Sequence, residues 1–120
     1  ARAVLGTRSE RRRLELLTAL HGVSVPTASA ILTLLDPRRY GVLDIRVWQL
    51  LFALGAVSER PHGVGFALRH WETYLATLRE HARARGLPVR AVELTLFHVH
   101  RRWQRGRLYD QDSRAVMPSR

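Results

Sequence analysis

Lysine and cysteine are both absent from this chain of 120 residues, and each absence excludes a kind of chemistry. Without cysteine there is neither a disulfide bond nor a thiolate ligand for a metal ion. Without lysine, no side-chain amine can form a Schiff base with a substrate. No apolar run approaches the length of a transmembrane helix or of a signal peptide. We therefore expect a cytoplasmic protein that has no membrane partner.

Acidic residues are also scarce. The chain has 10 aspartates and glutamates against 20 basic residues, all of them arginine, which gives a net charge of +10 and an isoelectric point near 11.6. A genome rich in G and C would explain arginine in place of lysine, but it would not explain a twofold excess of basic over acidic residues. A basic domain of this size favours a polyanionic partner such as a nucleic acid.

Strand patterns are lacking, whereas apolar residues recur at helical spacing along most of the chain. We predict an all-α fold of about five helices, near residues 9–20, 26–35, 45–54, 66–85 and 88–104. These helices form a single domain over residues 1–105. Within this domain we expect a core group of helices over residues 9–55 and a C-terminal helical pair over residues 66–105. A flexible basic tail is expected after the domain, at residues 106–120.

One stretch combines a tight turn with two helix starts. Gly22 allows a sharp turn, and Pro26 has a backbone angle suited to the first turn of the next helix. The start of that helix offers main-chain N–H groups and a partial positive charge, which suit a phosphate. Further on, Asp44 precedes an apolar helical stripe and is expected to cap that helix.

Together these segments resemble the helix-hairpin-helix motif of the DNA glycosylase superfamily, over roughly residues 14–54. The matching residues are Leu20, Gly22, Val23, Thr27 and Ala28 in the hairpin, then Leu43, Asp44, Val47 and Trp48. His21 and Ser24 replace the usual proline and second glycine. Pro26 stands where lyase-competent relatives have the Schiff-base lysine. The resemblance is therefore to monofunctional DNA glycosylases, which are N-glycosyl hydrolases without lyase activity.

The resemblance implies a DNA glycosylase-like fold that binds double-stranded DNA and serves base-excision DNA repair. Asp44 is the candidate catalytic residue, because the family places its catalytic aspartate at such a helix start. The candidate DNA-binding residues are Gly22, Val23, Ser24, Val25, Thr27, Ala28, Arg38, Arg39 and Arg46. In this family the hairpin can also hold a monovalent cation. We expect no other cofactor and no metal site. If the protein is bacterial, we expect it to associate with the nucleoid.

Two alternatives remain open. A non-catalytic DNA-binding module would keep the hairpin and use Asp44 only as a helix cap, and a protein-interaction or scaffold domain would use the same fold. The sequence does not show a pocket for a flipped base, and only about twenty residues precede the hairpin. We therefore expect a protein partner or an additional N-terminal half to complete an enzyme, and we favour DNA binding over catalysis.

Other polar and aromatic residues are expected to have structural roles. Trp48, Trp71 and Trp103 each fall on an apolar helical stripe, so we expect them to pack in the core rather than to stack on bases. Glu93 is an isolated acid on an apolar and basic helix. If it is buried, it needs an arginine partner, with Arg90, Arg101 or an arginine of the first helix as candidates.

Overall fold

The computed structural model describes residues 9–103, which form five α-helices and no β-strand. The helices are α2 (Glu10–Thr18), α3 (Val25–Leu35), α4 (Ile45–Ala53), α5 (Leu68–Arg85) and α6 (Val89–Trp103). This confirms the predicted all-α class, with helix ends within a few residues of the predicted ones. The expected basic tail at residues 106–120 and the first eight residues lie outside the described part.

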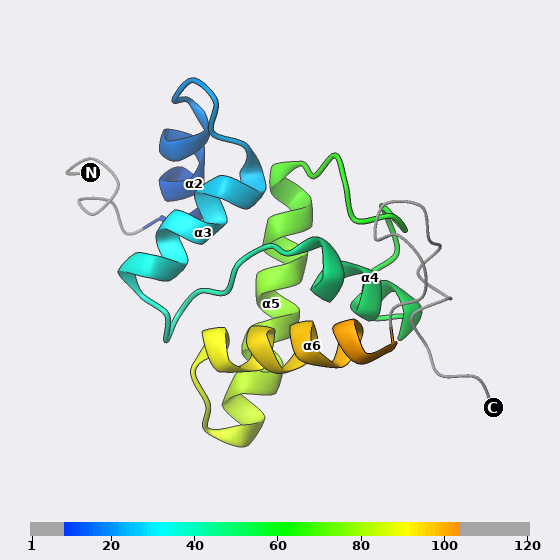
Figure 1. Cartoon of the computed structure of the whole chain (residues 1–120). Helices are drawn as coiled ribbons and strands as arrows, with labels where there is room; N and C mark the ends of the chain where they lie inside the picture. Colours follow the sequence, from blue (N-terminus) through cyan, green and yellow to red (C-terminus); the bar gives the residue numbers. More distant parts are fainter. Residues whose placement is uncertain (1–8, 104–120) are drawn as a thin grey trace.

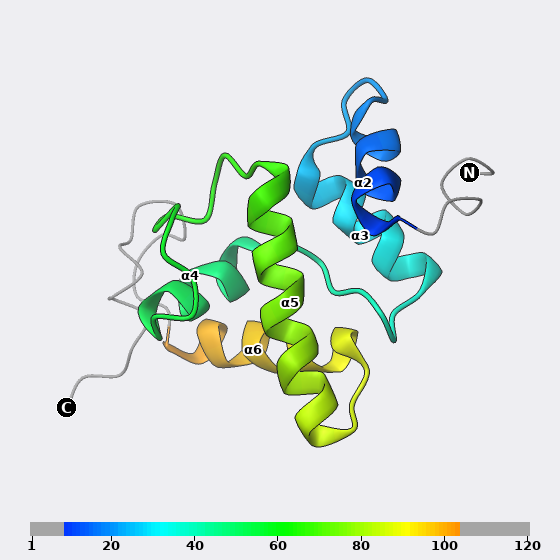
Figure 2. The ribbon, with the colours of Figure 1, turned by 180° about the vertical axis from the view of Figure 1, so that it is seen from behind.

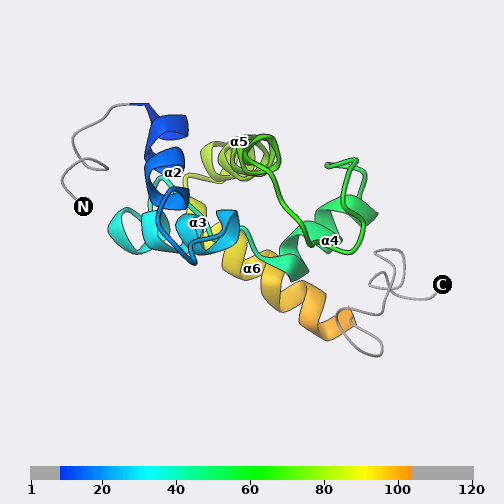
Figure 3. The ribbon, with the colours of Figure 1, turned by 90° about the horizontal axis from the view of Figure 1, so that it is seen from above.

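Helix α5 is the longest and runs through the middle of the molecule (Figure 1). The α2–α3 pair lies on one side of α5 and α4 lies on the other side, as the view from behind also shows (Figure 2). Helix α6 crosses α5 and contacts both α5 and α4. Seen from above, α6 extends from the α2–α3 side towards α4 (Figure 3). None of the helices within residues 9–103 has the length and hydrophobicity of a transmembrane helix.

The helix ends follow from local side chains. Ser9 caps α2 and Asp44 caps α4, because each side chain accepts a hydrogen bond from the first helical turn. The cap at Asp44 is the one that the sequence predicts. Ser24 caps α3 in the same way, although the sequence motif does not predict a cap at this position. Helix α5 ends at Gly86 in the left-handed conformation that favours glycine.

The core contains the tryptophans of α4 and α5. Trp48 and Trp71 are each only 1% exposed, which confirms that they pack in the core and do not present a face to a base. The Trp48 indole N–H donates to the carbonyls of Glu59 and Arg60 at 2.9 and 2.8 Å and so ties the loop before α5 to α4. Trp103, at the end of α6, is half-buried.

Residues 36–44 cross the centre of the molecule without regular structure. The Val42 N–H donates to Glu93 at 2.9 Å, and the Val42 carbonyl accepts from the Tyr74 hydroxyl at 2.7 Å. The Leu43 N–H donates to the Ser29 hydroxyl at 2.8 Å. The polar groups of a buried main chain need hydrogen-bond partners. Here side chains from α3, α5 and α6 supply the hydrogen bonds that a helix or a sheet would otherwise provide.

Glu93 is the buried acid at this crossing. It is 2% exposed and pairs with Arg90, one of the candidate partners that the sequence indicated. Burial raises the pKa of Glu93, while the hydrogen bonds from Val42 and Arg90 act in the opposite direction. Because Glu93 holds the Val42 main chain and pairs with the half-buried Arg90, its contacts fit the structural role that the sequence indicated.

Candidate nucleic-acid interface

The turn between α2 and α3, residues 19–24, is a β-turn around Gly22. The Val23 N–H donates to the Leu20 carbonyl at 3.2 Å, and Gly22 is the third residue of the turn with φ of 80°. A positive φ at this position is typical of a type II turn, in which the second position favours proline and here holds His21. A Cβ at Gly22 would meet no atom within 4 Å, so the backbone angle, rather than lack of space, requires glycine.

Ser24 replaces the second glycine of the motif without strain. Its backbone is extended, with φ of −82° and ψ of 171°, so this position does not need glycine. The Ser24 hydroxyl accepts a hydrogen bond from the Thr27 N–H at 3.3 Å and lies 3.0 Å from the Thr27 hydroxyl. The serine therefore caps α3 at the position where the resemblance predicts a second glycine.

Several main-chain donors of this turn are available. Within residues 9–103, the N–H groups of Gly22, Ser24 and Val25 have no hydrogen-bond partner. Gly22 and Ser24 are exposed, and Val25 is half-buried. Pro26 has no N–H, and the Thr27 N–H is already bound to Ser24. The free donors lie at the positive end of the α3 dipole, where an anion is stabilised.

The start of α4 lies beside the start of α3. The two helix starts line a shallow pocket of about 370 Å³, to which Ser24, Pro26, Leu43 and Ile45 contribute. Asp44 lies between two of these lining residues, but it is not itself part of the lining. One carboxylate oxygen of Asp44, Oδ1, accepts from the N–H groups of Arg46 and Val47 at 2.8 and 3.3 Å. The predicted cap is thus confirmed, whereas the catalytic role of Asp44 stays a prediction.

The three candidate arginines do not gather at the turn. The Arg46 guanidinium lies 5.1 Å from the ring centre of Phe97 on α6 and is half-buried. Arg38 and Arg39 follow the C-terminal end of α3, and the 11 residues of that helix separate them from the turn by about 16 Å. The structure therefore places these arginines in two regions, Arg46 on α4 against α6 and the other two beyond the far end of α3.

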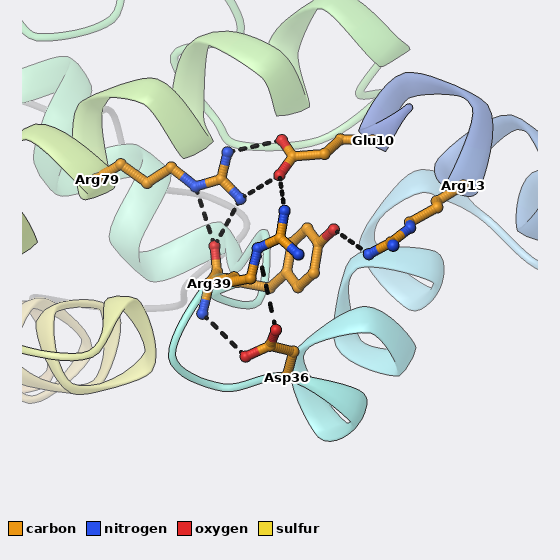
Figure 4. A network of polar contacts seen from close by, with 6 residues as sticks. Glu10, Arg13, Asp36, Arg39 and Arg79 are labelled. Carbon is orange, nitrogen blue, oxygen red and sulfur yellow. Dashed lines mark hydrogen bonds and ion pairs between the residues drawn. The ribbon is translucent and has the colours of Figure 1, made fainter. Parts of the chain in front are cut away.

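Arg39 belongs to an ion-pair network around Glu10 (Figure 4). Arg79 on α5 donates to both carboxylate oxygens of Glu10 at 2.6 and 2.7 Å, and Arg39 reaches the same carboxylate at 3.3 Å. Arg79 also donates to the Arg39 carbonyl through Nε and Nη2 at 3.0 and 2.8 Å. The hydrogen bond from Arg79 lowers the pKa of Glu10. The sequence does not indicate this network, because Glu10 and Arg79 are 69 positions apart.

His100 is a buried histidine near the C-terminal end of α6. It is fully buried, and its Nε2 lies 2.8 Å from the Gln49 side-chain oxygen. Burial, together with the charge of Arg46, lowers the pKa of His100 from 6.5 to about 4. The ring is therefore neutral at neutral pH. Within residues 9–103, no group of three or more histidine, aspartate or glutamate side chains is placed to hold a metal ion.

Comparison of the chain with protein-family models, with curated proteins and with solved structures found no match.

Proposed function

We propose that this protein binds double-stranded DNA through the α2–α3 turn, as a helix-hairpin-helix protein of DNA glycosylase-like fold, in base-excision DNA repair. The observation that supports the proposal is the set of unpartnered N–H groups at Gly22, Ser24 and Val25 in the exposed turn. Phosphate oxygens of the DNA backbone are suitable acceptors for such groups at a helix start. Because phosphates carry no base identity, binding is largely independent of sequence.

The charge of the chain supports the same proposal. A net charge of +10 attracts DNA over the range of the Debye length and raises the rate of association. The turn itself carries no arginine, so its main-chain donors position the phosphate while the arginines elsewhere supply the electrostatic attraction. Arg46 is the candidate arginine on α4, whose start lies beside the turn.

Base excision by Asp44 is a second candidate function. The observation in its favour is that Leu43 and Ile45, on either side of Asp44, line the pocket that the α2–α3 turn also lines. A carboxylate at that place could support the positive charge that develops on the sugar. Against it, one carboxylate oxygen is engaged in capping α4. We therefore propose DNA binding as the main function and excision as a separate hypothesis.

The test compares two glycine variants that carry the same backbone strain. Gly22 and Gly55 both have φ of 80°, and neither has an atom within 4 Å of an added Cβ. Valine at either position should cost about 1–3 kcal/mol of stability. We expect Gly22→Val to weaken binding of a labelled DNA duplex by at least about tenfold, because the free N–H groups move. Gly55→Val, after the end of α4, should bind as the parent protein does.

Fluorescence anisotropy at several salt concentrations gives the affinities. The logarithm of the binding constant should fall linearly with the logarithm of the salt concentration, by about 0.9 for each phosphate that is neutralised. Equal affinities for the two valine variants would show that the turn is not the contact. A salt-independent affinity, or no binding at low salt, would reject the nucleic-acid proposal.

A further inference from the structure

At the far end of α3 from the turn, four arginines surround a cavity of about 390 Å³. Arg38 and Arg39 come from the segment after α3, and Arg79 and Arg83 come from α5. Glu10 is the one acidic residue of the lining, so the lining has a net charge of three positive charges. We call this cavity the arginine pocket. It is separate from the α2–α3 turn and is not part of the proposed duplex interface.

Two of the four arginines are held in place before any ligand binds. The Glu10 carboxylate orients Arg79 and Arg39, and the Arg39 carbonyl fixes the Arg79 guanidinium from the other side (Figure 4). A preformed arrangement of this kind lowers the entropy that binding costs. The ion pair also neutralises part of the charge, which leaves the other two arginines as the main source of attraction.

Arg38 and Arg83 are those other two arginines. Both are exposed, and within residues 9–103 neither guanidinium has an ion-pair or hydrogen-bond partner. The planar donor fork of arginine matches the oxygens of a phosphate group. The same cavity has an apolar part, to which Ala82, Leu87 and Val89 contribute. The pocket therefore offers two unpaired arginines that can bind a phosphate group. Beside them lies an apolar surface that can contact a less polar part of the same ligand.

We propose that the arginine pocket binds a phosphate monoester of nucleotide size, either a free nucleotide or the phosphorylated end of a nucleic-acid strand. A dianionic phosphate matches the surplus of positive charge better than the single charge of an internal phosphodiester does. The cavity volume lies at the lower end of the range of small-molecule sites, about 300–1,000 Å³, and so suits one nucleotide rather than a duplex.

The experiment uses the full chain and isothermal titration calorimetry at low salt. The probes are adenosine 5′-monophosphate, adenosine and inorganic phosphate. We expect the monophosphate to bind, adenosine not to bind, and inorganic phosphate to bind more weakly because it lacks the body that fills the apolar part. In the double variant Arg38→Gln with Arg83→Gln, affinity for the monophosphate should fall by at least about tenfold.

The matched control removes the same charge elsewhere. Arg60 and Arg102 are exposed and lie outside the arginine pocket. The double variant Arg60→Gln with Arg102→Gln should bind the monophosphate within about twofold of the parent protein, because exposed charges contribute little at a distance. Thermal melting checks that both double variants are folded. If the two double variants weaken binding equally, only net charge attracts the ligand and the pocket proposal is wrong.

Further outcomes also decide the proposal. Absence of monophosphate binding overturns it, and so does adenosine or inorganic phosphate binding as tightly as the monophosphate. Tighter binding of a 5′-phosphorylated oligonucleotide than of its 5′-hydroxyl form would identify a strand end as the ligand. Monophosphate binding without that preference would identify a free nucleotide. Gly22→Val should still bind the monophosphate, so a failure of duplex binding at the turn can be told apart from a failure of the arginine pocket.

Discussion

At the scale of single residues, Asp44 has an observed structural role as a helix cap and a proposed catalytic role. Its Oδ1 atom accepts two main-chain N–H groups at the start of α4, which by itself explains an aspartate at this position. Leu43 and Ile45 on either side of it line the pocket beside the turn. A variant that keeps the cap but removes the charge separates the two roles.

Asp44→Asn is that variant. Asparagine caps a helix about as well as aspartate, so the free energy of unfolding should change by less than about 1 kcal/mol. DNA binding should be equal or tighter, because a negative charge is removed. If the protein is a glycosylase, excision should be lost, because the charge that stabilises the developing sugar cation is gone. A panel of duplexes with deaminated, alkylated or oxidised bases provides the measurement.

Two controls complete this prediction. Asp44→Ala removes the cap and should cost about 0.5–2 kcal/mol in a urea titration. If neither the parent protein nor Asp44→Asn excises any base, the non-catalytic module is the correct interpretation. A stability loss in Asp44→Asn far above the ~1 kcal/mol typical of a helix cap would instead show that the charge itself has a partner in the folded protein.

At the scale of elements, the segment 36–44 is held in place by side chains of α3, α5 and α6. Gly41 is buried where this segment passes α5 and α6. A Cβ at Gly41 would lie 2.9 Å from Leu78 Cδ1, 3.2 Å from Glu93 Cβ and 3.3 Å from Val89 Cγ1. Glycine is thus required here by close packing, in contrast to Gly22, where the backbone angle requires it.

Gly41→Ala should therefore destabilise the protein by about 1–3 kcal/mol through overpacking. Leu78→Ala, which removes the nearest atom, should cost about 2–5 kcal/mol through the cavity it leaves. The double variant should cost less than the sum, because the new methyl group partly fills that cavity, and urea unfolding of all four proteins measures the coupling. Strict additivity would show that Gly41 does not pack against Leu78 as the structure places it.

At the scale of the whole molecule, buried and half-buried ionisable groups link the free energy of unfolding to pH. Burial and the charge of Arg46 lower the pKa of His100 from 6.5 to about 4, so its contribution to stability is complete above pH 6.5 and is lost as the pH falls towards about 4. The pKa of Glu10 is also lowered, and its contribution is lost at more acidic pH, below 4.5. The raised pKa of Glu93 acts in the opposite sense, since its protonated form is favoured by folding.

A variant comparison isolates the histidine from these opposing groups. His100→Asn should melt with a weaker dependence on pH between 6.5 and about 4 than the parent protein, because the ring that must take up a proton in the core is removed. His98→Asn, at an exposed position of the same helix, should keep the dependence of the parent protein. Identical pH profiles for His100→Asn and the parent would show that His100 does not titrate in this range.

The helices, the cap at Asp44 and the turn could be predicted from the sequence, because each depends on residues a few positions apart. The spacing of apolar residues predicts α3 to α6, the side chain of Asp44 caps the helix that it precedes, and Gly22 supplies the positive φ of the turn. The N–H groups that carry the DNA-binding proposal belong to this local geometry. Ser24 is the exception, since a glycine-based motif gave no reason to expect a cap there.

The tertiary structure alone decided which distant residues meet. Glu10 joins Arg39 and Arg79 over 29 and 69 positions, and Glu93 and Tyr74 bind the main chain of Val42 over 51 and 32 positions. No local rule selects such partners, because any of several arginines could satisfy the same carboxylate. The packing of α5 between the α2–α3 pair and α4 makes the choice, because it brings Arg79 of α5 to Glu10 of α2.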